Sequence, residues 1–162
     1  MTIPSERGRG MTDDELNDFL TNSRIIAKIA TVDKNGWPSV NPVWYEYNEG
    51  YFYLVTKEKV SFVPNIRNDN RVALCIENWE IPYKRVIVKG VAEFIDQDWV
   101  EMGRRMTLRY LGTPGLSYFN ATLHLPRIVV RIKPVKMSTW AGTGIDRTFF
   151  KAASWRALEA EG

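Results

Sequence analysis

The fold class of this chain is decided by the stretch IIAKIATVDKNGWPSVNPVWYEYNEGYFYLVT, residues 25–56. Three segments within it, residues 25–32, 37–47 and 51–56, are rich in the β-branched and aromatic residues that favour strands. Asn35-Gly36 joins the first two segments, and this dipeptide is typical of a tight β-hairpin because it accepts positive φ. The stretch therefore predicts three consecutive antiparallel strands.

The last of these strands ends in a basic loop, Thr56-Lys57-Glu58-Lys59, and Ser61 follows it. A short helix is expected to begin near Ser61, and the free backbone N–H groups at a helix start favour anions. Two lysines beside such a start suit a phosphate group. The alternative is that Lys57 and Lys59 are ordinary solvated charges on a loop.

Size and charge bound the function. The chain has 162 residues, which predicts one domain that can bury a core but is small for enclosing a cofactor alone, so a site shared by two subunits is considered. Lysine and arginine number 22 against 19 acidic residues, and a net charge of +3 gives no indication of a nucleic-acid partner. No apolar run is long enough for a membrane span and the start lacks a signal peptide, so a cytoplasmic location is expected.

The remaining segments complete an all-antiparallel pattern. Thr12 and Glu15 form a capping-box pattern that predicts a helix start, and a second helix is predicted from about Trp99 to Leu111. Further strands are predicted at residues 71–77, 85–95 and 127–133. Six to seven antiparallel strands with two or three helices indicate an α+β fold built around a β-barrel. Residues 1–10 are expected to be a flexible arm, 11–150 the domain, and 151–162 a tail.

Four residues mark places where the β-ladder is expected to be irregular. Pro38 and Pro42 cannot donate ladder hydrogen bonds, so their segment is expected at a sheet edge, a bulge or a kink. Gly90 stands in mid-strand, where glycine often marks a bulge or the close approach of another backbone. Pro134 is predicted to end the last strand.

Several reactive or charged side chains have structural interpretations. Cys75 and His124 are the only cysteine and histidine, which excludes an internal disulfide and a Cys/His zinc cluster, and no metal site is expected. Cys75 lies in an apolar strand and is expected to be buried. Arg105 and Arg109 share one face of the second helix, where they are either solvated or an anionic-substrate patch.

The order of these pieces resembles the pyridoxamine 5'-phosphate oxidase-like, FMN-binding split β-barrel superfamily. The resemblance covers roughly four fifths of the chain, from about residue 11 to 142. Each piece alone is a weak signal, and their shared order and spacing carry the resemblance. The segments concerned are residues 30–38, Pro42-Val43-Trp44-Tyr45, Thr56, residues 65–72, residues 88–92, and Arg131-Ile132-Lys133-Pro134 with Trp140.

The resemblance implies an antiparallel split β-barrel that forms a homodimer with cofactor grooves between the subunits. Such proteins bind FMN in many cases and the deazaflavin F420 in a related branch. The matching positions imply contacts to the flavin ring from one strand, contacts to the phosphate from the following loop, and contacts from the partner chain. They are Asn41, Pro42, Val43, Trp44 and Tyr45 for the ring; Thr56, Lys57, Lys59 and Ser61 around the phosphate, with Phe62 and Asn65 in the same Ser-x-x-x-Asn loop; and Arg85 and Trp140 from the partner. Lys57, Lys84 and Arg85 are the candidate cations near the reduced ring.

Two departures from the family pattern leave alternatives open. Phe62 stands where family members often place a basic residue, and Ile145-Asp146-Arg147-Thr148 replaces an Arg-x-His segment of the true oxidase. The function expected first is a flavin-dependent oxidoreductase that binds FMN and needs no catalytic side chain of its own, acting on a small molecule that the sequence does not identify. The alternatives are an F420-dependent reductase of the same fold and a non-catalytic flavin- or haem-binding protein, in which His124 would be the haem ligand.

Overall fold

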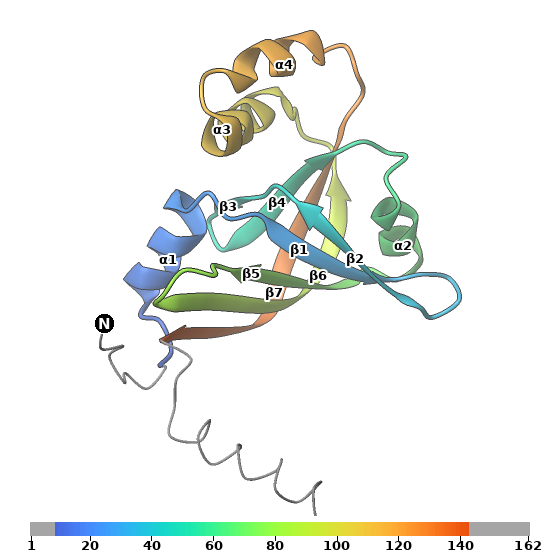
Figure 1. Cartoon of the computed structure of the whole chain (residues 1–162). Helices are drawn as coiled ribbons and strands as arrows, with labels where there is room; N and C mark the ends of the chain where they lie inside the picture. The colour runs from blue at the N-terminus through green and yellow to red at the C-terminus, as the bar shows by residue number, and fades with distance from the viewer. Residues whose placement is uncertain (1–8, 143–162) are drawn as a thin grey trace, which may run out of the picture.

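The computed structural model describes residues 9–142, and residues 143–150, Arg147 among them, lie outside this range with the predicted tail. Seven strands and four helices form one antiparallel sheet with peripheral helices, an α+β fold (Figure 1). The strands are β1 (Ala27–Val32), β2 (Pro38–Val43), β3 (Glu46–Asn48), β4 (Tyr51–Thr56), β5 (Arg71–Glu77), β6 (Tyr83–Ile95) and β7 (Ile128–Gly142). The helices are α1 (Asp13–Asn22), α2 (Phe62–Asn68), α3 (Val100–Leu111) and α4 (Gly115–Ala121).

The predicted hairpin is confirmed. β1 and β2 pair antiparallel from Ala27 opposite Val43 to Val32 opposite Pro38, and Gly36 in the turn has a φ of 84°. The predicted second segment is divided into β2 and β3, because the chain leaves the ladder at Trp44 and Tyr45. β2, which carries both prolines, lies at an edge of the sheet as predicted.

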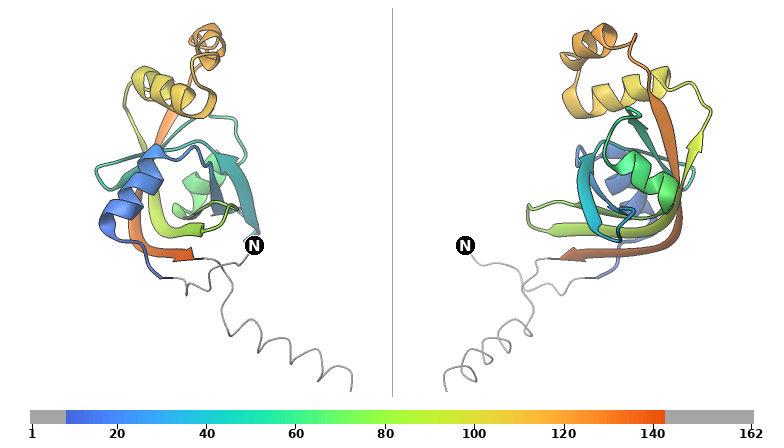
Figure 2. Two further views of the ribbon diagram at one scale, coloured as in Figure 1. Left: turned by 60° about the vertical axis from the view of Figure 1, so that its left-hand side comes forward. Right: turned by 90° about the vertical axis from the view of Figure 1, so that its right-hand side faces the viewer.

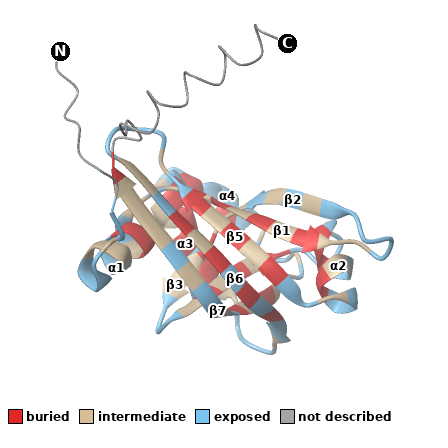
Figure 3. Ribbon diagram, turned by 90° about the horizontal axis from the view of Figure 1, so that it is seen from below, coloured by how far each residue is buried: buried red, intermediate tan, exposed pale blue. Residues whose placement is uncertain are grey.

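The sheet curls into an open barrel with the order β2-β1-β5-β6-β7-β4-β3, so β2 and β3 are its two edges (Figure 2). Residues alternate between buried and exposed along β1, β4 and β5, as expected for strands with one face toward a core. Figure 3 shows this alternation as bands that cross neighbouring strands. α2 completes the main core with Phe62, Val63 and Ile66.

The prediction that Pro134 ends the last strand is wrong, because a β-bulge carries β7 through it. Lys89 pairs with Lys136 and Gly90 with Pro134, so Val135 has no partner on β6 and is 72% exposed. A proline is tolerated here because a bulge interrupts the ladder in any case. A Cβ on Gly90 would lie 2.9 Å from the Lys133 carbonyl oxygen, so the close backbone approach predicted for Gly90 is confirmed.

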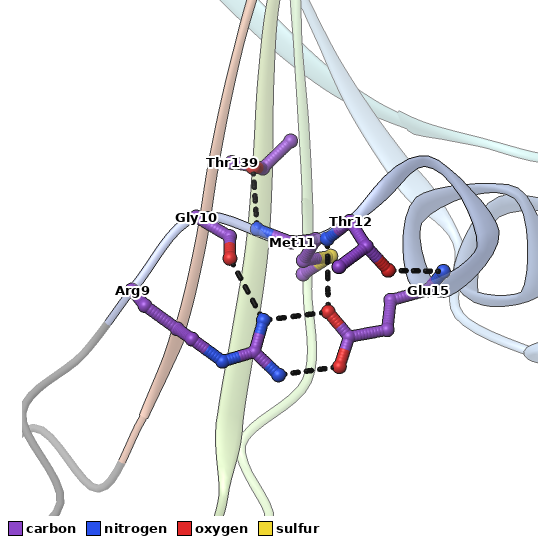
Figure 4. Close-up of polar contacts among 6 residues, drawn as sticks. All are labelled: Arg9, Gly10, Met11, Thr12, Glu15 and Thr139. Carbon is purple, nitrogen blue, oxygen red and sulfur yellow. Dashed lines mark hydrogen bonds and ion pairs between the residues drawn. The ribbon is translucent and has the colours of Figure 1, made fainter.

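The start of α1 is a capping box, as predicted. The Thr12 hydroxyl accepts a hydrogen bond from the Glu15 N–H at 3.2 Å, and the Glu15 carboxylate accepts one from the Thr12 N–H at 2.9 Å (Figure 4). Arg9, which the sequence assigned to the arm, also binds this carboxylate and exchanges two backbone hydrogen bonds with Ala141. The first helix is thereby tied to the end of β7.

α3 and α4 lie together at one end of the barrel (Figure 1). The helix predicted at residues 99–111 is confirmed, and the turn at Gly112 ends it with a φ of 70°. α4 is one helix more than predicted. α3 packs on the outside of the sheet through a second core of Met102, Met106 and Tyr110 with Val129. Within residues 9–142, no helix combines the length and the apolar character that crossing a bilayer requires.

Candidate functional site

The predicted phosphate loop and the predicted ring strand meet in the structure. The Ser61 hydroxyl donates a hydrogen bond to the Asn41 side-chain oxygen at 3.2 Å, and this bond links the loop after β4 to the edge strand β2. The Asn65 side chain donates to the Thr31 hydroxyl at 3.0 Å and holds α2 against β1. Side-chain hydrogen bonds therefore join residues that are 20 or more positions apart in the sequence.

The loop of residues 57–61 carries positive charge that the described part of the chain does not neutralise. Lys57 and Lys59 are exposed, and no carboxylate of residues 9–142 forms an ion pair with either. Glu58, the acidic residue between them, is instead paired with Arg67 at 2.7 Å. Arg67 also lies 5.0 Å from the centre of the Phe94 ring. Two lysines thus remain available to an anion beside the Ser61 hydroxyl.

The predicted ring strand lines a cavity of about 320 Å³ between the sheet and the helices α3 and α4, which we call the sheet–helix cavity. Five predicted site residues line it: Pro42, Val43, Trp44, Thr56 and Phe62. The Trp44 ring is held by stacking on Tyr110, with ring centres 5.1 Å apart and an interplanar angle of 15°.

Two of the predicted residues have side chains in the core. Tyr45 is fully buried, and its ring packs against Phe52. Phe62 is 2% exposed and belongs to the main core, although its surface also borders the sheet–helix cavity. Phe62 therefore contributes packing at the position where a basic residue was expected, and the positive charge of the loop comes from its lysines.

Arg109 has a structural role that the sequence did not indicate. Its guanidinium donates hydrogen bonds to the carbonyl oxygens of Ser23 at 2.7 Å, Leu20 at 2.8 Å and Tyr45 at 3.1 Å, and lies over the Tyr45 ring. Burial raises the pKa of Tyr45, and it raises the pKa of Tyr110 to about 12. Both hydroxyls therefore stay protonated near neutral pH and can donate to their neighbours.

The other two arginines of α3 are paired with acids. Arg105 binds Glu46 at 2.7 Å, and Arg104 binds Glu101 at 3.2 Å. Arg104 and Arg105 are exposed, as the solvated alternative expects, and their pairing with acids leaves neither as a free group for an anionic substrate.

Lys84, Arg85 and Trp140 lie away from the phosphate loop of the same chain. Arg85 pairs with Trp140 across β6 and β7, and its guanidinium is 6.0 Å from the centre of the indole. All three line a second hollow of about 780 Å³ with residues such as Ile25 and Trp79. Thr56 pairs with Ile128 at the opposite end of β7, twelve positions before Trp140, which is roughly 40 Å as measured along the strand.

The sequence missed the helical wall of the sheet–helix cavity. That wall comes from α3, α4 and the residues beside them, among them Trp99, Met106, Phe119 and Arg127. Cys75 is half-buried rather than buried, and burial raises the pKa of its thiol. His124 lies exposed in the loop after α4 and does not border this cavity.

Known proteins share the sequence pattern and the architecture of this chain. The sequence matches the family described as Pyridoxamine 5'-phosphate oxidase over residues 12–141, and no curated protein matches it significantly. A conserved hypothetical protein of Mycobacterium tuberculosis has a similar structure, with 27% identity and a TM-score of 0.69 over 81% of this chain and 85% of the other.

Two more distant solved structures share the fold. One is an F420 reductase, with 21% identity and a TM-score of 0.61 over 75% of this chain and 94% of that one. The other is a FAD-binding protein of Mesorhizobium loti, with 20% identity and a TM-score of 0.61 over 83% and 96%. With the open antiparallel barrel and a family match across most of its length, this chain belongs to the pyridoxamine 5'-phosphate oxidase family.

Proposed function

We propose that this protein is a flavin-dependent oxidoreductase that binds FMN in a groove between two copies of the chain. The observation that carries the proposal is the hydrogen bond between Ser61 and Asn41, because it joins a loop suited to phosphate to a strand suited to a flat ring. Membership of the family supports the proposal, as does the likeness of the fold to a FAD-binding protein.

The donor set of the loop fits a phosphate dianion. Lys57 and Lys59 supply charge, Ser61 supplies a hydroxyl, and the pairing of Glu58 with Arg67 keeps the local carboxylate away from the lysines. Charge-assisted hydrogen bonds to phosphate are stronger than neutral ones, so these groups are expected to contribute much of the affinity. Thr56, which is 9% exposed, is the last residue of β4 and directly precedes Lys57.

The ring would lie along residues 41–44. The stacking of Trp44 on Tyr110, and the hydrogen bonds of the Tyr110 hydroxyl with the backbone of Tyr45, fix the orientation of the indole before any ligand arrives. Bound FMN would supply hydride transfer, and the chain would supply orientation and exclusion of water. No side chain of this site needs to act as an acid or a base.

A second copy of the chain would complete the groove. Lys84, Arg85 and Trp140 are at the far end of β7 from Thr56, so a single chain does not bring them to its own phosphate loop. In a homodimer, these residues of one copy would face the loop of the other and place positive charge beside the reduced ring. Such charge stabilises an anionic reduced flavin.

An F420-dependent reductase is the second candidate. The buried Phe62 removes one cation from the usual phosphate position, and the fold is similar to that of an F420 reductase. The long polyanionic tail of F420 would require more of the basic surface than the phosphate of FMN does.

The test begins with the absorbance spectrum of the purified protein and parallel titrations with FMN, F420 and riboflavin. A Lys57→Ala, Lys59→Ala variant is expected to bind FMN about 10-fold or more weakly and to keep its affinity for riboflavin, which lacks the phosphate. The matched control is Lys133→Ala, Lys136→Ala, which removes two exposed lysines of β7.

Three outcomes decide between the candidates. Tight binding of F420 with no response to FMN would favour the second candidate. Equal losses for FMN and riboflavin would refute the role given to the lysines, and failure to bind either cofactor would contradict the enzyme proposal. A haem spectrum that His124→Ala abolishes would favour a storage role instead.

The redox half of the proposal needs a turnover experiment. FMN bound to the protein is reduced without oxygen, and its reoxidation by added organic acceptors is followed by absorbance. We expect at least one acceptor to reoxidise the bound flavin faster than it reoxidises free FMN. Equal rates for bound and free flavin across all acceptors would contradict catalysis while leaving binding intact.

A further inference from the structure

The sheet–helix cavity has a mostly apolar lining that includes one charged side chain. The sheet contributes Val43, Leu54 and Val55, and the helices contribute Met106 and Phe119. A volume of about 320 Å³ is near the lower end of ligand pockets, which span roughly 300–1,000 Å³. The space therefore suits one small, mostly apolar molecule.

Arg127 is the only charged residue among those that line this cavity. Its Nε atom is buried and has no hydrogen-bond partner within residues 9–142, and no carboxylate of that range pairs with its guanidinium. The hydroxyls of Thr107 and Thr122 donate to the carbonyl oxygens of Gly103 and Phe119, and neither accepts a hydrogen bond from Arg127. A buried donor without a partner is unfavourable.

The aromatic lining sets the position of this cation. The Arg127 guanidinium carbon lies 5.7 Å from the centre of the Trp99 ring, and Trp99 in turn meets Phe119 edge to face with ring centres 6.1 Å apart. A guanidinium held against an indole keeps its planar edge for a carboxylate, which it can bind with two parallel hydrogen bonds. The aromatic rings beside it favour a flat ligand body.

We propose that the sheet–helix cavity binds a small aromatic carboxylate, whose carboxylate group pairs with Arg127 and whose ring lies among Trp99, Phe119 and Trp44. The cavity shares Pro42, Trp44 and Thr56 with the proposed cofactor site, so this ligand would be the substrate. Only its assignment as the substrate rests on the proposed function. Binding of the carboxylate itself does not depend on which cofactor the protein holds.

The test uses naphthoate and its neutral amide, naphthamide, as matched ligands, with calorimetry on the protein as purified and again after addition of FMN. We expect naphthoate to bind the wild type at least about 10-fold more tightly than naphthamide, because hydrogen bonds between charged groups are the strong class. Arg127→Met is expected to remove this preference and to leave the affinity for naphthamide within about 2-fold. Arg104→Met, which removes an exposed arginine of α3, is the control and should change neither affinity.

Other outcomes would overturn the proposal. Equal affinities of the wild type for the two ligands, no binding of either, or an unchanged preference in Arg127→Met would each do so. If Arg127→Met does not fold, Arg127→Lys decides, since it keeps the charge but not the two-pronged geometry and should reduce the preference without abolishing it. The FMN titration of the same samples is read separately: loss of naphthoate binding with FMN binding intact refutes this inference alone, and the reverse refutes the cofactor assignment alone.

Discussion

Arg109 and the lysines of the loop at residues 57–61 differ in whether their positive charge has partners within the fold. Arg109 is enclosed by carbonyl oxygens of α1, the segment after it and the segment after β2, and every contact is internal to the fold. Lys57 and Lys59 are exposed and lack a carboxylate partner within the described residues. The first arrangement stabilises the domain, and the second is the one that we propose for the phosphate of a cofactor. Whether a cationic side chain is structural or available to a ligand therefore depends on its partners in the fold, which its position in the sequence does not reveal.

The largest effect is expected for Arg109→Met. This change leaves the carbonyl groups of Leu20 and Ser23 without the guanidinium donor, whereas the Tyr45 carbonyl keeps the Tyr110 hydroxyl. Each buried group left unsatisfied costs about 1–3 kcal/mol. We expect the free energy of unfolding to fall by about 3 kcal/mol or more, measured by urea denaturation. Arg104→Met should change it by less than about 0.5 kcal/mol. A loss below about 1 kcal/mol for Arg109→Met would show that these contacts contribute little.

Tyr110→Phe tests the same region with a smaller change. The Tyr110 hydroxyl donates to the Tyr45 carbonyl oxygen at 3.2 Å and accepts from the Tyr45 N–H at 3.3 Å. The variant therefore leaves the buried Tyr45 N–H without this acceptor, while the carbonyl keeps its hydrogen bond from Arg109. We expect a loss of about 1–2 kcal/mol in the free energy of unfolding. The exposed Tyr118 provides the control, and Tyr118→Phe should leave the denaturation midpoint unchanged. Equal effects of the two variants would contradict this role.

The dependence of stability on pH should differ between Arg109, whose partners are carbonyl oxygens, and Arg9, whose partner Glu15 titrates. The hydrogen bond from Arg9 is the main cause that lowers the pKa of Glu15 from 4.5 to about 2. A lowered folded-state pKa gives stability that is complete above pH 4.5 and is lost as the pH falls toward 2. Glu15→Gln should therefore lower the denaturation midpoint at neutral pH and match the wild type near pH 2. The effect of Arg109→Met should persist across this range, because carbonyl oxygens do not titrate there.

The smallest effect on stability is expected for Lys57 and Lys59, which have no carboxylate partner within the described residues. Without ligand, Lys57→Ala, Lys59→Ala should change the free energy of unfolding by less than about 0.5 kcal/mol. With saturating FMN the wild type should gain thermal stability and the variant should gain less, because stabilisation follows the ratio of ligand concentration to Kd. A large loss in the absence of FMN would mean that the lysines are structural.

The sequence predicted best where local chemistry decides the structure. Asn35-Gly36 defined its hairpin, Thr12 and Glu15 their helix start, and Gly90 its close contact, because each depends on neighbours or on backbone geometry alone. It failed at Pro134, where the bulge depends on a register set by the opposite strand.

The candidate site also contains residues that could be predicted from the sequence and residues that could not. The placement of Pro42, Val43 and Trp44 beside a cavity follows from strand order and could be expected from the resemblance. The roles of Arg109 and Arg127 could not, because both depend on how α3 and α4 pack on the sheet. Arg109 and Arg127 are chemically identical side chains, and only the packing gives partners to the first and none to the Nε of the second.

The prolines of β2 also limit the pairing of further strands at this edge of the sheet. β2 is an edge of the open sheet and pairs with β1 alone, so the N–H groups of alternate residues point outward, where another strand could add. Pro38, Val40 and Pro42 share one orientation along the strand, and the prolines have no N–H to offer. Only Val40 keeps an N–H on that side. The edge is therefore a poor template for aggregation, although Val40 is 65% exposed.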